Sequence, residues 1–272
     1  MGIEKTKKSF IGVIHLPALP GDPMVSSNQS VDSAYRHAMR DAAALHDGGV
    51  DGVIIENFGS APFYKGDAKQ RTPPHQAAMI TRVCLAVKAN YPHLKVGVNC
   101  LRNDAYTALG IASVTGADFI RVNVHTGAYL TDQGVIEGEA AHTLSYRRSL
   151  NALHVEIWAD ILVKHATPLA PITPEQAASD TLKRGGADAL IVTGNGTGAT
   201  VDLDMVKRVV PLMGTSPLYL GSGVTAQSAA ELAPYASGAI VGTALKIDGD
   251  VLNPVCSKRT RSIYKALMNA WS

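Results

Sequence analysis

The sequence is poor in several features that mark whole classes of protein. Only three of its 272 residues are cysteines, and no two form a C-x-x-C pair, which excludes a cysteine zinc cluster and argues against a disulfide scaffold. The formal net charge of +2 is too small to predict a nucleic-acid partner. No apolar run approaches the roughly 18 residues that a membrane span requires, and the N-terminal segment has no signal-peptide cleavage site. We therefore expect a cytoplasmic protein with no nucleic-acid or membrane partner.

The composition is that of a folded chain, with 46% hydrophobic and 18% charged residues. Eight short, β-branched apolar runs predict strands at Phe10–Leu16, Val50–Asn57, Lys95–Cys100, Asp118–Val124, Val155–Leu162, Ala187–Gly194, Pro217–Gly223 and Gly238–Ala244. Each is followed by a stretch of helical period, at Ser33–Asp47, Pro74–Tyr91, Asp104–Thr115, Ala140–Ala152, Pro174–Arg184, Leu203–Val210, Ala226–Leu232 and Pro254–Trp271. Strands and helices thus alternate along the whole chain.

This alternation predicts an α/β fold with a parallel sheet. Dividing 272 residues by eight gives 34 per unit, close to one βα unit, and eight units close into a (β/α)₈ TIM barrel. The rival is an open, doubly wound sheet. It is disfavoured because no G-x-G-x-x-G follows the first strand and no change in composition marks a second domain. We predict one barrel domain over residues 1–272.

Three predicted connections exceed the usual length of a βα loop, namely Pro17–Asp32, Phe58–Pro73 and Thr126–Glu139. All three follow strands, so they would lie at the C-terminal face of the barrel, where active sites are built. They are predicted to bind substrate or cover it, the alternative being plain surface insertions.

Polar side chains occur where strands should end facing the barrel interior. They are His15, Glu56, Asn99, Arg121, Asn123, His125, Asp160, Lys164, Thr193 and Asn195. The parity of the fourth and fifth predicted strands also points Glu156 inward. Ionised groups inside a barrel are costly unless paired, so the structural alternative is a set of internal ion pairs of Arg121 with Glu156 or Asp160.

The residue types suggest acid–base chemistry. Asp160, Glu56 and His125 are candidate general acids or bases. Lys164 is either a cation for a phosphate or carboxylate, or a Schiff-base lysine if desolvated. The cation is favoured because neighbouring Asp160 should keep the amine protonated. The predicted substrate-binding residues are His15, Asn99, Arg121, Asn123, Thr193 and Asn195.

A divalent metal is a less favoured reading of the same strand ends. His15, Glu56, His125, Asp160 and His165 could converge on one ion, but no H-x-H or H-E-x-x-H pair supports this. No cofactor is therefore predicted.

Two glycine turns predict a phosphate site. Gly221, Ser222 and Gly223 follow the seventh predicted strand, and Gly242 and Thr243 follow the eighth. Loops at these two positions of a barrel commonly bind phosphate through backbone N–H groups that glycine allows to approach closely. The alternative is that glycine only relieves crowding in tight turns.

Several segments resemble the BtpA/SgcQ family over nearly the whole chain. They are Ile11–Gly21 (IGVIHLPALPG), Gly52–Phe63 (GVIIENFGSAPF), Arg121–Gly127 (RVNVHTG), Ala159–His165 (ADILVKH) and Tyr219–Val224 (YLGSGV). The resemblance implies a TIM barrel of the phosphate-binding type. The cyanobacterial namesake of that family is associated with photosystem I biogenesis, and another member belongs to a sugar-metabolism operon. The resemblance supplies no catalytic residues.

Together these patterns predict an enzyme acting on a small phosphorylated metabolite, a sugar phosphate or nucleotide derivative, by lyase, isomerase or aldolase chemistry. The alternative is a non-catalytic biogenesis or assembly factor that keeps the phosphate-binding barrel. Barrels of this kind often form dimers, so a homo-oligomer stays open.

Overall fold

A computed structural model describes residues 8–194, 196 and 200–272 of the chain. Its strands are β1 (Ser9–His15), β2 (Gly52–Glu56), β3 (Lys95–Asn99), β4 (Phe119–Val122), β5 (Ala128–Thr131), β6 (Gly134–Glu137), β7 (Glu156–Ile161), β8 (Ala166–Pro168), β9 (Ala189–Val192), β10 (Leu218–Leu220) and β11 (Gly238–Val241). Its α-helices are α1 (Val31–Gly48), α2 (Pro74–Asn90), α3 (Ala105–Thr115), α4 (Ala140–Ser149), α5 (Pro174–Ser179), α6 (Leu203–Val209), α7 (Ala229–Leu232) and α8 (Ser257–Trp271).

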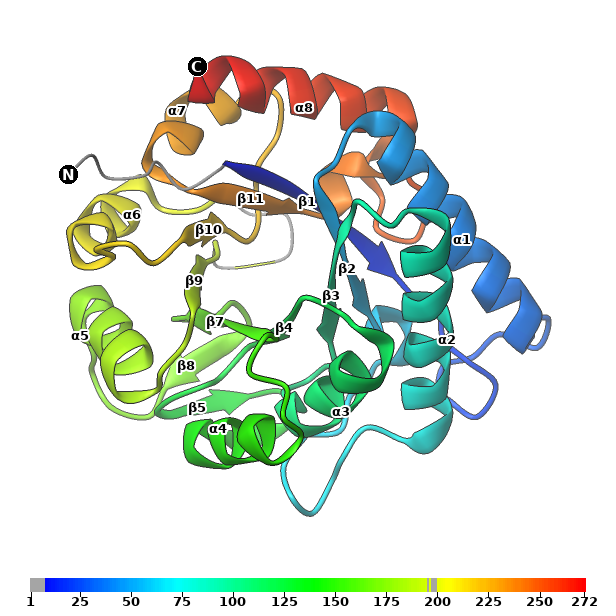
Figure 1. The fold of residues 1–272 in the computed structure, drawn as a ribbon, viewed down its shortest axis with the longest axis horizontal. Coiled ribbons are helices and arrows are strands. Elements are labelled where there is room, and N and C mark those ends of the chain that lie inside the picture. Colours follow the sequence, from blue (N-terminus) through cyan, green and yellow to red (C-terminus); the bar gives the residue numbers. More distant parts are fainter. Residues whose placement is uncertain (1–7, 195, 197–199) are drawn as a thin grey trace.

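Eight strands close into a parallel barrel in the order β1-β11-β10-β9-β7-β4-β3-β2, with the helices around it (Figure 1). The predicted TIM barrel is thereby confirmed. The register pairs His15 with Glu56 and Glu56 with Asn99, so the polar ends of β1, β2 and β3 lie side by side at one mouth of the barrel. The β-branched strand sequences suit this arrangement because a parallel barrel strand is buried on both faces.

Aromatic rings fill the interior below that mouth. The rings of Phe119 and Trp158 stack with centroids 3.6 Å apart, and Trp158 stacks on Tyr219 at 4.1 Å. Gly97 on β3 makes room for them, since a Cβ there would lie 2.2 Å from the Phe119 ring. The interior is thus a packed plug, and an open cavity can exist only toward the strand ends.

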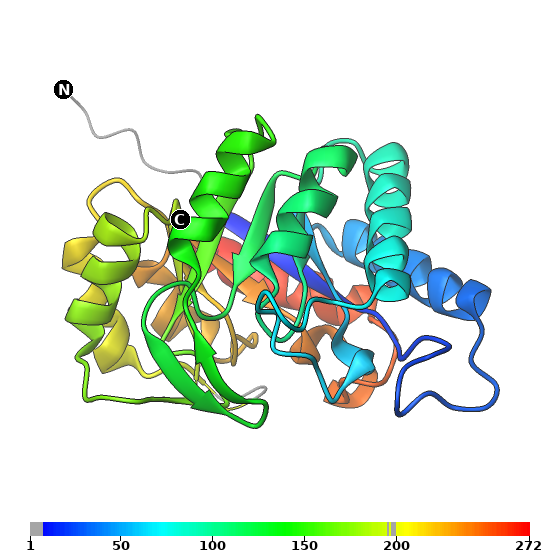
Figure 2. The same cartoon turned by 90° about the horizontal axis from the view of Figure 1, so that it is seen from below.

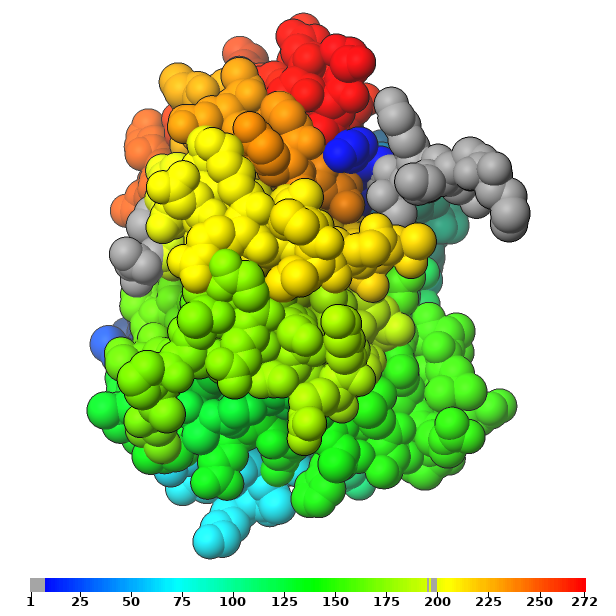
Figure 3. Space-filling model, turned by 90° about the vertical axis from the view of Figure 1, so that its left-hand side faces the viewer, coloured from blue at the N-terminus to red at the C-terminus, as the bar shows by residue number. Residues whose placement is uncertain are grey.

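The outer core lies between the barrel and its helices. Strand residues of the opposite parity, such as Ile120 and Val122, pack there against the helices, as the alternation of the sequence predicts. Figure 3 shows one side of this outer layer, where the chain rises from α5 through α6 and α7 toward the end of α8. Ser30 and Thr173 cap α1 and α5 through side-chain oxygens that accept backbone N–H groups, so the helices start where the sequence signals place them, give or take a few residues.

One departure from the plain barrel is a small antiparallel sheet with the order β6-β5-β8. The predicted loop Thr126–Glu139 folds into the β5–β6 hairpin, and β8, which follows β7, pairs with β5. Figure 2 shows this hairpin projecting from the same end of the molecule as the segment that follows β2. Among the described residues, none of the helices is long and apolar enough to cross a membrane.

Candidate functional site

A cavity of about 800 Å³ opens at the C-terminal ends of the barrel strands, a volume typical of small-molecule sites. Apolar walls come from Val13, Phe58, Phe63, Leu101 and Val224. The ionisable and amide side chains that line it are His15, Glu56, Asn99, Arg102, Arg121, Asn123, Asp132, Lys164, His165 and Arg259. Three of these are arginines, which stay charged, and only two are carboxylates, so the cavity favours an anionic ligand.

Arg121 is the centre of a buried charge cluster. Its Nε and Nη2 atoms donate to the two oxygens of Asp160 at 2.9 and 3.0 Å, and Nη1 lies 3.5 Å from Glu56 Oε1. Burial disfavours the guanidinium charge, but Asp160 and Glu56 outweigh it and raise the pKa of Arg121. Arg121 is therefore a fixed positive charge in the cavity wall, and the expected internal ion pair forms with Asp160.

Glu156 keeps the predicted inward parity but does not take part in this cluster, so the alternative pairing of Arg121 with Glu156 is wrong. It is the first residue of β7, at the opposite mouth of the barrel, where its side chain is half exposed. Its Oε2 accepts a hydrogen bond from Trp158 Nε1 at 2.8 Å and lies 4.0 Å from Lys95 Nζ. Parity gives the face of the sheet but not the depth along the strand, and the start of β7 leaves this carboxylate in contact with solvent.

The two carboxylates of the cluster differ in access. Glu56 lines the cavity and accepts from Asn99 Nδ2 at 2.9 Å. Asp160 is buried behind Arg121 and is not among the described cavity-lining residues, and its Oδ2 also accepts from Asn123 Nδ2 at 3.0 Å. The geometry makes Glu56 the accessible acid or base and assigns Asp160 to holding Arg121.

The two predicted histidines lie in different places. His15 lines the cavity, 4.6 Å from Phe58 between ring centroids, and its Nδ1 has no hydrogen-bond partner among the described residues. Burial, together with the positive charges of Lys246 and Lys164, holds the pKa of His15 well below its usual range. His15 therefore presents a neutral ring to a ligand.

The predicted inward position of His125 is wrong. β4 ends at Val122 and the chain bends at Asn123, so the two-residue alternation stops before His125. Its Nε2 instead donates to the Gly185 carbonyl at 2.8 Å, outside the cavity, and burial lowers its pKa. The contact joins the segment after β4 to the end of the helical segment after β7.

Lys164 reaches the cavity from a strained turn after β7. Its backbone N–H donates to Thr193 Oγ1 at 3.1 Å, and its carbonyl accepts from Arg102 Nη2 at 2.8 Å. Burial and the charge of Arg121 lower the pKa of Lys164. Asp160 and Glu56 oppose this shift, as expected for neighbouring carboxylates, but they do not outweigh it.

The remaining predicted binding residues divide by position. Asn99 and Asn123 line the cavity, whereas Thr193 is buried behind it and positions the Lys164 backbone. Asn195 lies outside the described residues. No three His, Cys, Asp or Glu side chains come together as a metal site within the described ranges.

Both glycine turns line the cavity, through Gly221, Ser222 and Gly223 and through Gly242 and Thr243. A Cβ on Gly221 would lie 2.4 Å from Ile191, and one on Gly242 would lie 2.8 Å from His15. Within the described chain, no acceptor is found for the backbone N–H of Gly223 or of Thr243. The turns thus offer an anion two donors that the fold itself does not use.

Arg259 adds a charge that the sequence patterns did not indicate. It lies on α8, and its Nε donates to the Ala244 carbonyl at 3.0 Å, directly after the second glycine turn. Its side chain forms part of the cavity wall at that end. A helical arginine near the C-terminus gives no signal of its own, and only the closed barrel brings it beside Gly242.

Two of the three long loops contribute to the cavity. Phe58 and Phe63 come from the segment after β2, and Asp132 comes from the tip of the β5–β6 hairpin. None of the described cavity-lining residues comes from Pro17–Asp32, and this loop is held instead by buried Asp22. Asp22 accepts from the backbone N–H of Leu19, Ser60 Oγ, His75 Nε2 and Gln76 Nε2 at 2.6–2.9 Å.

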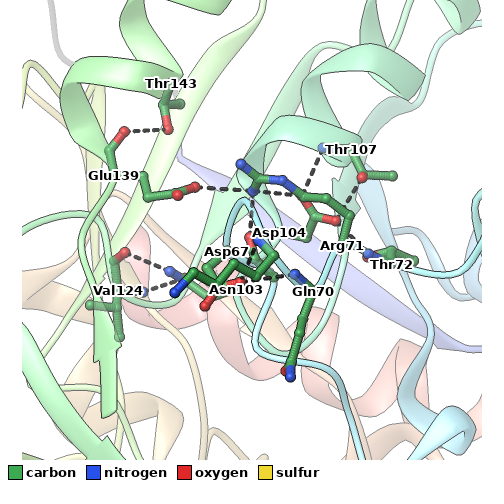
Figure 4. Close-up of polar contacts among 12 residues, drawn as sticks. Asp67, Gln70, Arg71, Thr72, Asn103, Asp104, Thr107, Val124, Glu139 and Thr143 are labelled. Carbon is green, nitrogen blue, oxygen red and sulfur yellow. Dashed lines mark hydrogen bonds and ion pairs between the residues drawn. The ribbon is translucent and has the colours of Figure 1, made fainter.

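A second polar network fixes the ends of the two cavity loops to the barrel (Figure 4). Arg71 Nη1 lies 3.2 Å from Asp104 Oδ1 and 3.0 Å from Glu139 Oε2, joining the segment before α2 to the starts of α3 and α4. The Asn103 side chain pairs with both backbone groups of Val124 at 2.7 and 2.8 Å. These bonds hold the loop bases, so the cavity wall is preorganised.

Comparison with known proteins gives both a family and a fold. The model of the BtpA family matches residues 6–269. The photosystem I biogenesis protein BtpA of Synechocystis is 40% identical over 263 residues, covering 97% of this chain and 89% of that protein. Among solved structures, the tryptophan synthase alpha chain of Legionella pneumophila is similar at a TM-score of 0.60 and 16% identity, covering 98% of this chain and 94% of that one. The 3-keto-L-gulonate-6-phosphate decarboxylase of Vibrio cholerae reaches 0.57 and 13%, covering 98% and 100%. At these identities the solved structures show the fold alone.

Proposed function

The chain belongs to the BtpA family, and from that premise and the geometry of the cavity we propose that it is an enzyme acting on a small phosphorylated metabolite. The substrate class is a sugar phosphate or a nucleotide derivative. The reaction is of the lyase, isomerase or aldolase type, carried out by proton transfer at the C-terminal face of the barrel.

One observation carries the proposal: two glycine turns with unused backbone donors and a buried charge cluster line a single cavity. The glycine turns and Arg259 line one part of the wall, and Glu56 with Arg121 lines the part beside it, since a Cβ on Gly221 would lie 3.4 Å from Arg121 Nη2. A phosphate bound at the turns would place the rest of a small metabolite against the buried cluster. The similar decarboxylase is named for a sugar phosphate, 3-keto-L-gulonate-6-phosphate, and this name agrees with the proposed substrate class.

Each charged group has a distinct task in this scheme. Glu56 transfers protons, because it is the cavity carboxylate nearest the cluster. Arg121 stabilises negative charge that develops on the substrate, and the bidentate bond to Asp160 keeps its guanidinium in place before the reaction begins. Neutral His15 supplies a hydrogen bond without adding charge.

Ligand-induced thermal stabilisation tests the anion site. Inorganic phosphate, sugar phosphates and nucleotides should raise the melting temperature, and the corresponding unphosphorylated sugars and nucleosides should not. Arg259→Gln should weaken phosphate binding roughly tenfold, the value of one charge-assisted hydrogen bond. Arg261→Gln is the matched control, since Arg261 lies on the same helix but donates to the Asp47 carbonyl. Equal effects of the two variants, or no stabilisation by any anion, would refute the site.

Turnover measurements test the role of Glu56. Extracted metabolites or phosphorylated sugars are incubated with the protein and followed by mass spectrometry and NMR. Glu56→Gln should abolish conversion while phosphate still stabilises the variant, because the amide cannot accept the proton but keeps the shape of the side chain. Conversion that survives in Glu56→Gln would remove this carboxylate from the mechanism.

The second candidate function is a non-catalytic assembly factor. The observation in its favour is the 40% identity to a protein named for photosystem I biogenesis. This reading predicts ligand binding without conversion, and no loss of function in Glu56→Gln. The buried cluster of Arg121 with Asp160 and Glu56 favours the enzyme, because a pure scaffold gains little from charges whose burial is costly.

A further inference from the structure

The turn that carries Lys164 is built unlike an ordinary strand-to-helix connection. Leu162 and His165 flank the position with φ angles of 46° and 57°, a left-handed conformation that is unfavourable for a residue with a side chain. The turn is nevertheless fixed from both sides by Thr193 and Arg102 through the Lys164 backbone. The result of this conformation is that the Lys164 side chain lines the cavity.

The amine of Lys164 has a setting that suits a nucleophile better than a structural cation. Within the described residues no carboxylate lies within 4 Å of its Nζ, whereas Arg121 is paired on two sides. Burial first, and then the positive charges of Arg121 and Arg102, disfavour the ammonium form and lower the pKa of Lys164, against the opposing pull of Glu56 and Asp160. Lysines are activated in this way, by desolvation beside other cations.

We propose that Lys164 is a catalytic nucleophile that forms an imine with a carbonyl-bearing phosphorylated substrate. This inference rests on the proposed function and narrows it: the substrate is an aldehyde or ketone, and its phosphate occupies the glycine turns. Arg121 then serves the carbanion or oxyanion formed next to the imine.

The step balances without an oxidant or reductant. The lone pair of the neutral amine forms a bond to the carbonyl carbon, and the C=O π pair moves to oxygen, which takes a proton to give a carbinolamine. Loss of that oxygen as water leaves the imine, the two amine hydrogens leaving with it. A further proton converts the imine to the iminium electron sink, and we assign its delivery to Glu56, which lines the same cavity.

Pyridoxal 5′-phosphate is a suitable probe, because it joins an aldehyde to a phosphate and reduction with borohydride fixes its adducts. The intact protein is labelled, reduced and mapped by peptide mass spectrometry. Lys164 should label faster than the exposed lysines, because burial beside Arg121 lowers its pKa and leaves more of the amine neutral. Pyridoxal lacking the phosphate should label Lys164 more slowly, and inorganic phosphate should protect it. Dihydroxyacetone phosphate or ribulose 5-phosphate with cyanoborohydride should give adducts at the same residue.

Variants separate the chemistry from the fold. Lys164→Arg keeps a basic side chain and should lose the adduct. Lys95→Arg is the control and should leave the adduct unchanged, because the Lys95 side chain is half exposed at the opposite mouth of the barrel. Peptide mapping of the protein without substitutions tests the inference even if a variant fails to fold. Labelling spread evenly over the exposed lysines, in a protein that phosphate still stabilises, overturns the inference and leaves the proposed function intact. A different result would support the nucleophile and refute the phosphate site: pyridoxal labels Lys164 as rapidly as pyridoxal 5′-phosphate does, and inorganic phosphate does not protect the residue.

Discussion

The ion pair of Lys246 with Asp41 links the second glycine turn to α1, and its removal provides a measurable test of how the cavity is held. Both side chains are fully buried, and Nζ lies 2.6 Å from Oδ2. Asp41 also accepts from the Val255 backbone N–H at 3.1 Å and lies 3.4 Å from His37 Nε2. Despite its burial, hydrogen bonds from His37 and the charge of Lys246 lower the pKa of Asp41.

The pKa of Lys246 is lowered as well, because burial of the ammonium outweighs the attraction of Asp41. The lowered pKa of Asp41 means that the fold favours its charged form, whereas the lowered pKa of Lys246 means that the fold disfavours its charged form. The effect on Lys246 weighs more, because Asp41 is its one strong partner among the described residues. The pair as a whole therefore adds little net stability, whereas either charge left alone would be costly.

We predict that Asp41→Asn and Lys246→Met each lower the free energy of unfolding by about 3–5 kcal/mol, or the melting temperature by roughly 6–10 °C. The double variant leaves no buried charge at this place, and the introduced amide oxygen would still accept from the Val255 backbone N–H. It should be no less stable than either single variant, which gives a coupling energy of about 3 kcal/mol or more.

Urea unfolding of the four proteins, followed by circular dichroism, measures this cycle. Arg40→Gln is the control: Arg40 approaches the same carboxylate at 3.5 Å but is half exposed, so its loss should cost less than about 1 kcal/mol. Because Lys246 directly follows the turn Gly242–Leu245, Lys246→Met should also weaken phosphate binding. Additive single effects, or single costs as small as that of Arg40→Gln, would refute the reasoning.

Three further changes have defined outcomes. Gly242→Ala should push against His15, 2.8 Å from the new Cβ, costing about 1–3 kcal/mol of stability and weakening phosphate binding in titration calorimetry. Asp160→Asn should lower stability by about 3 kcal/mol and reduce kcat, because Arg121 loses its bidentate carboxylate; steady-state kinetics that change KM alone would contradict this. Hydrogen bonds outweigh burial and lower the pKa of Asp22, so its stabilisation is complete above the ordinary carboxyl pKa of 3.8 and is lost as pH falls through the folded value. Asp22→Asn should therefore reduce the acid sensitivity of unfolding between about pH 5 and pH 2, measured by urea titration at each pH.

The sequence predicted the barrel well because eight apolar runs with turns between them leave few other folds. It also predicted that Glu56 and Arg121 face the barrel interior, since parity is reliable wherever the strand is regular. The same rule failed for His125, which lies beyond the end of its strand, and it could not place Glu156 at the solvent-exposed mouth of the barrel, away from Arg121. Parity describes backbone geometry and contains no information on where solvent begins.

Other parts of the site had no local signal. Arg259 reaches the glycine turn only after the barrel closes, and Asp41 and Lys246 are 205 residues apart in the chain. The Thr126–Glu139 segment read as a loop because two four-residue strands give too few alternations to register as a hairpin. Such contacts come from tertiary packing, which single-sequence patterns do not contain.

The hairpin has a consequence for how the protein family can diversify. Its strands rest on a small core of their own, made by Val124, Tyr129, Ile136 and Val163, separate from the two cores of the barrel. Its tip supplies Asp132 to the cavity, and its edge pairs with the strand that follows Lys164. Under the proposed function, substitutions at the tip would alter which substrates fit without disturbing the packing of the barrel or the glycine turns. Substrate choice and fold stability would then evolve separately in this architecture.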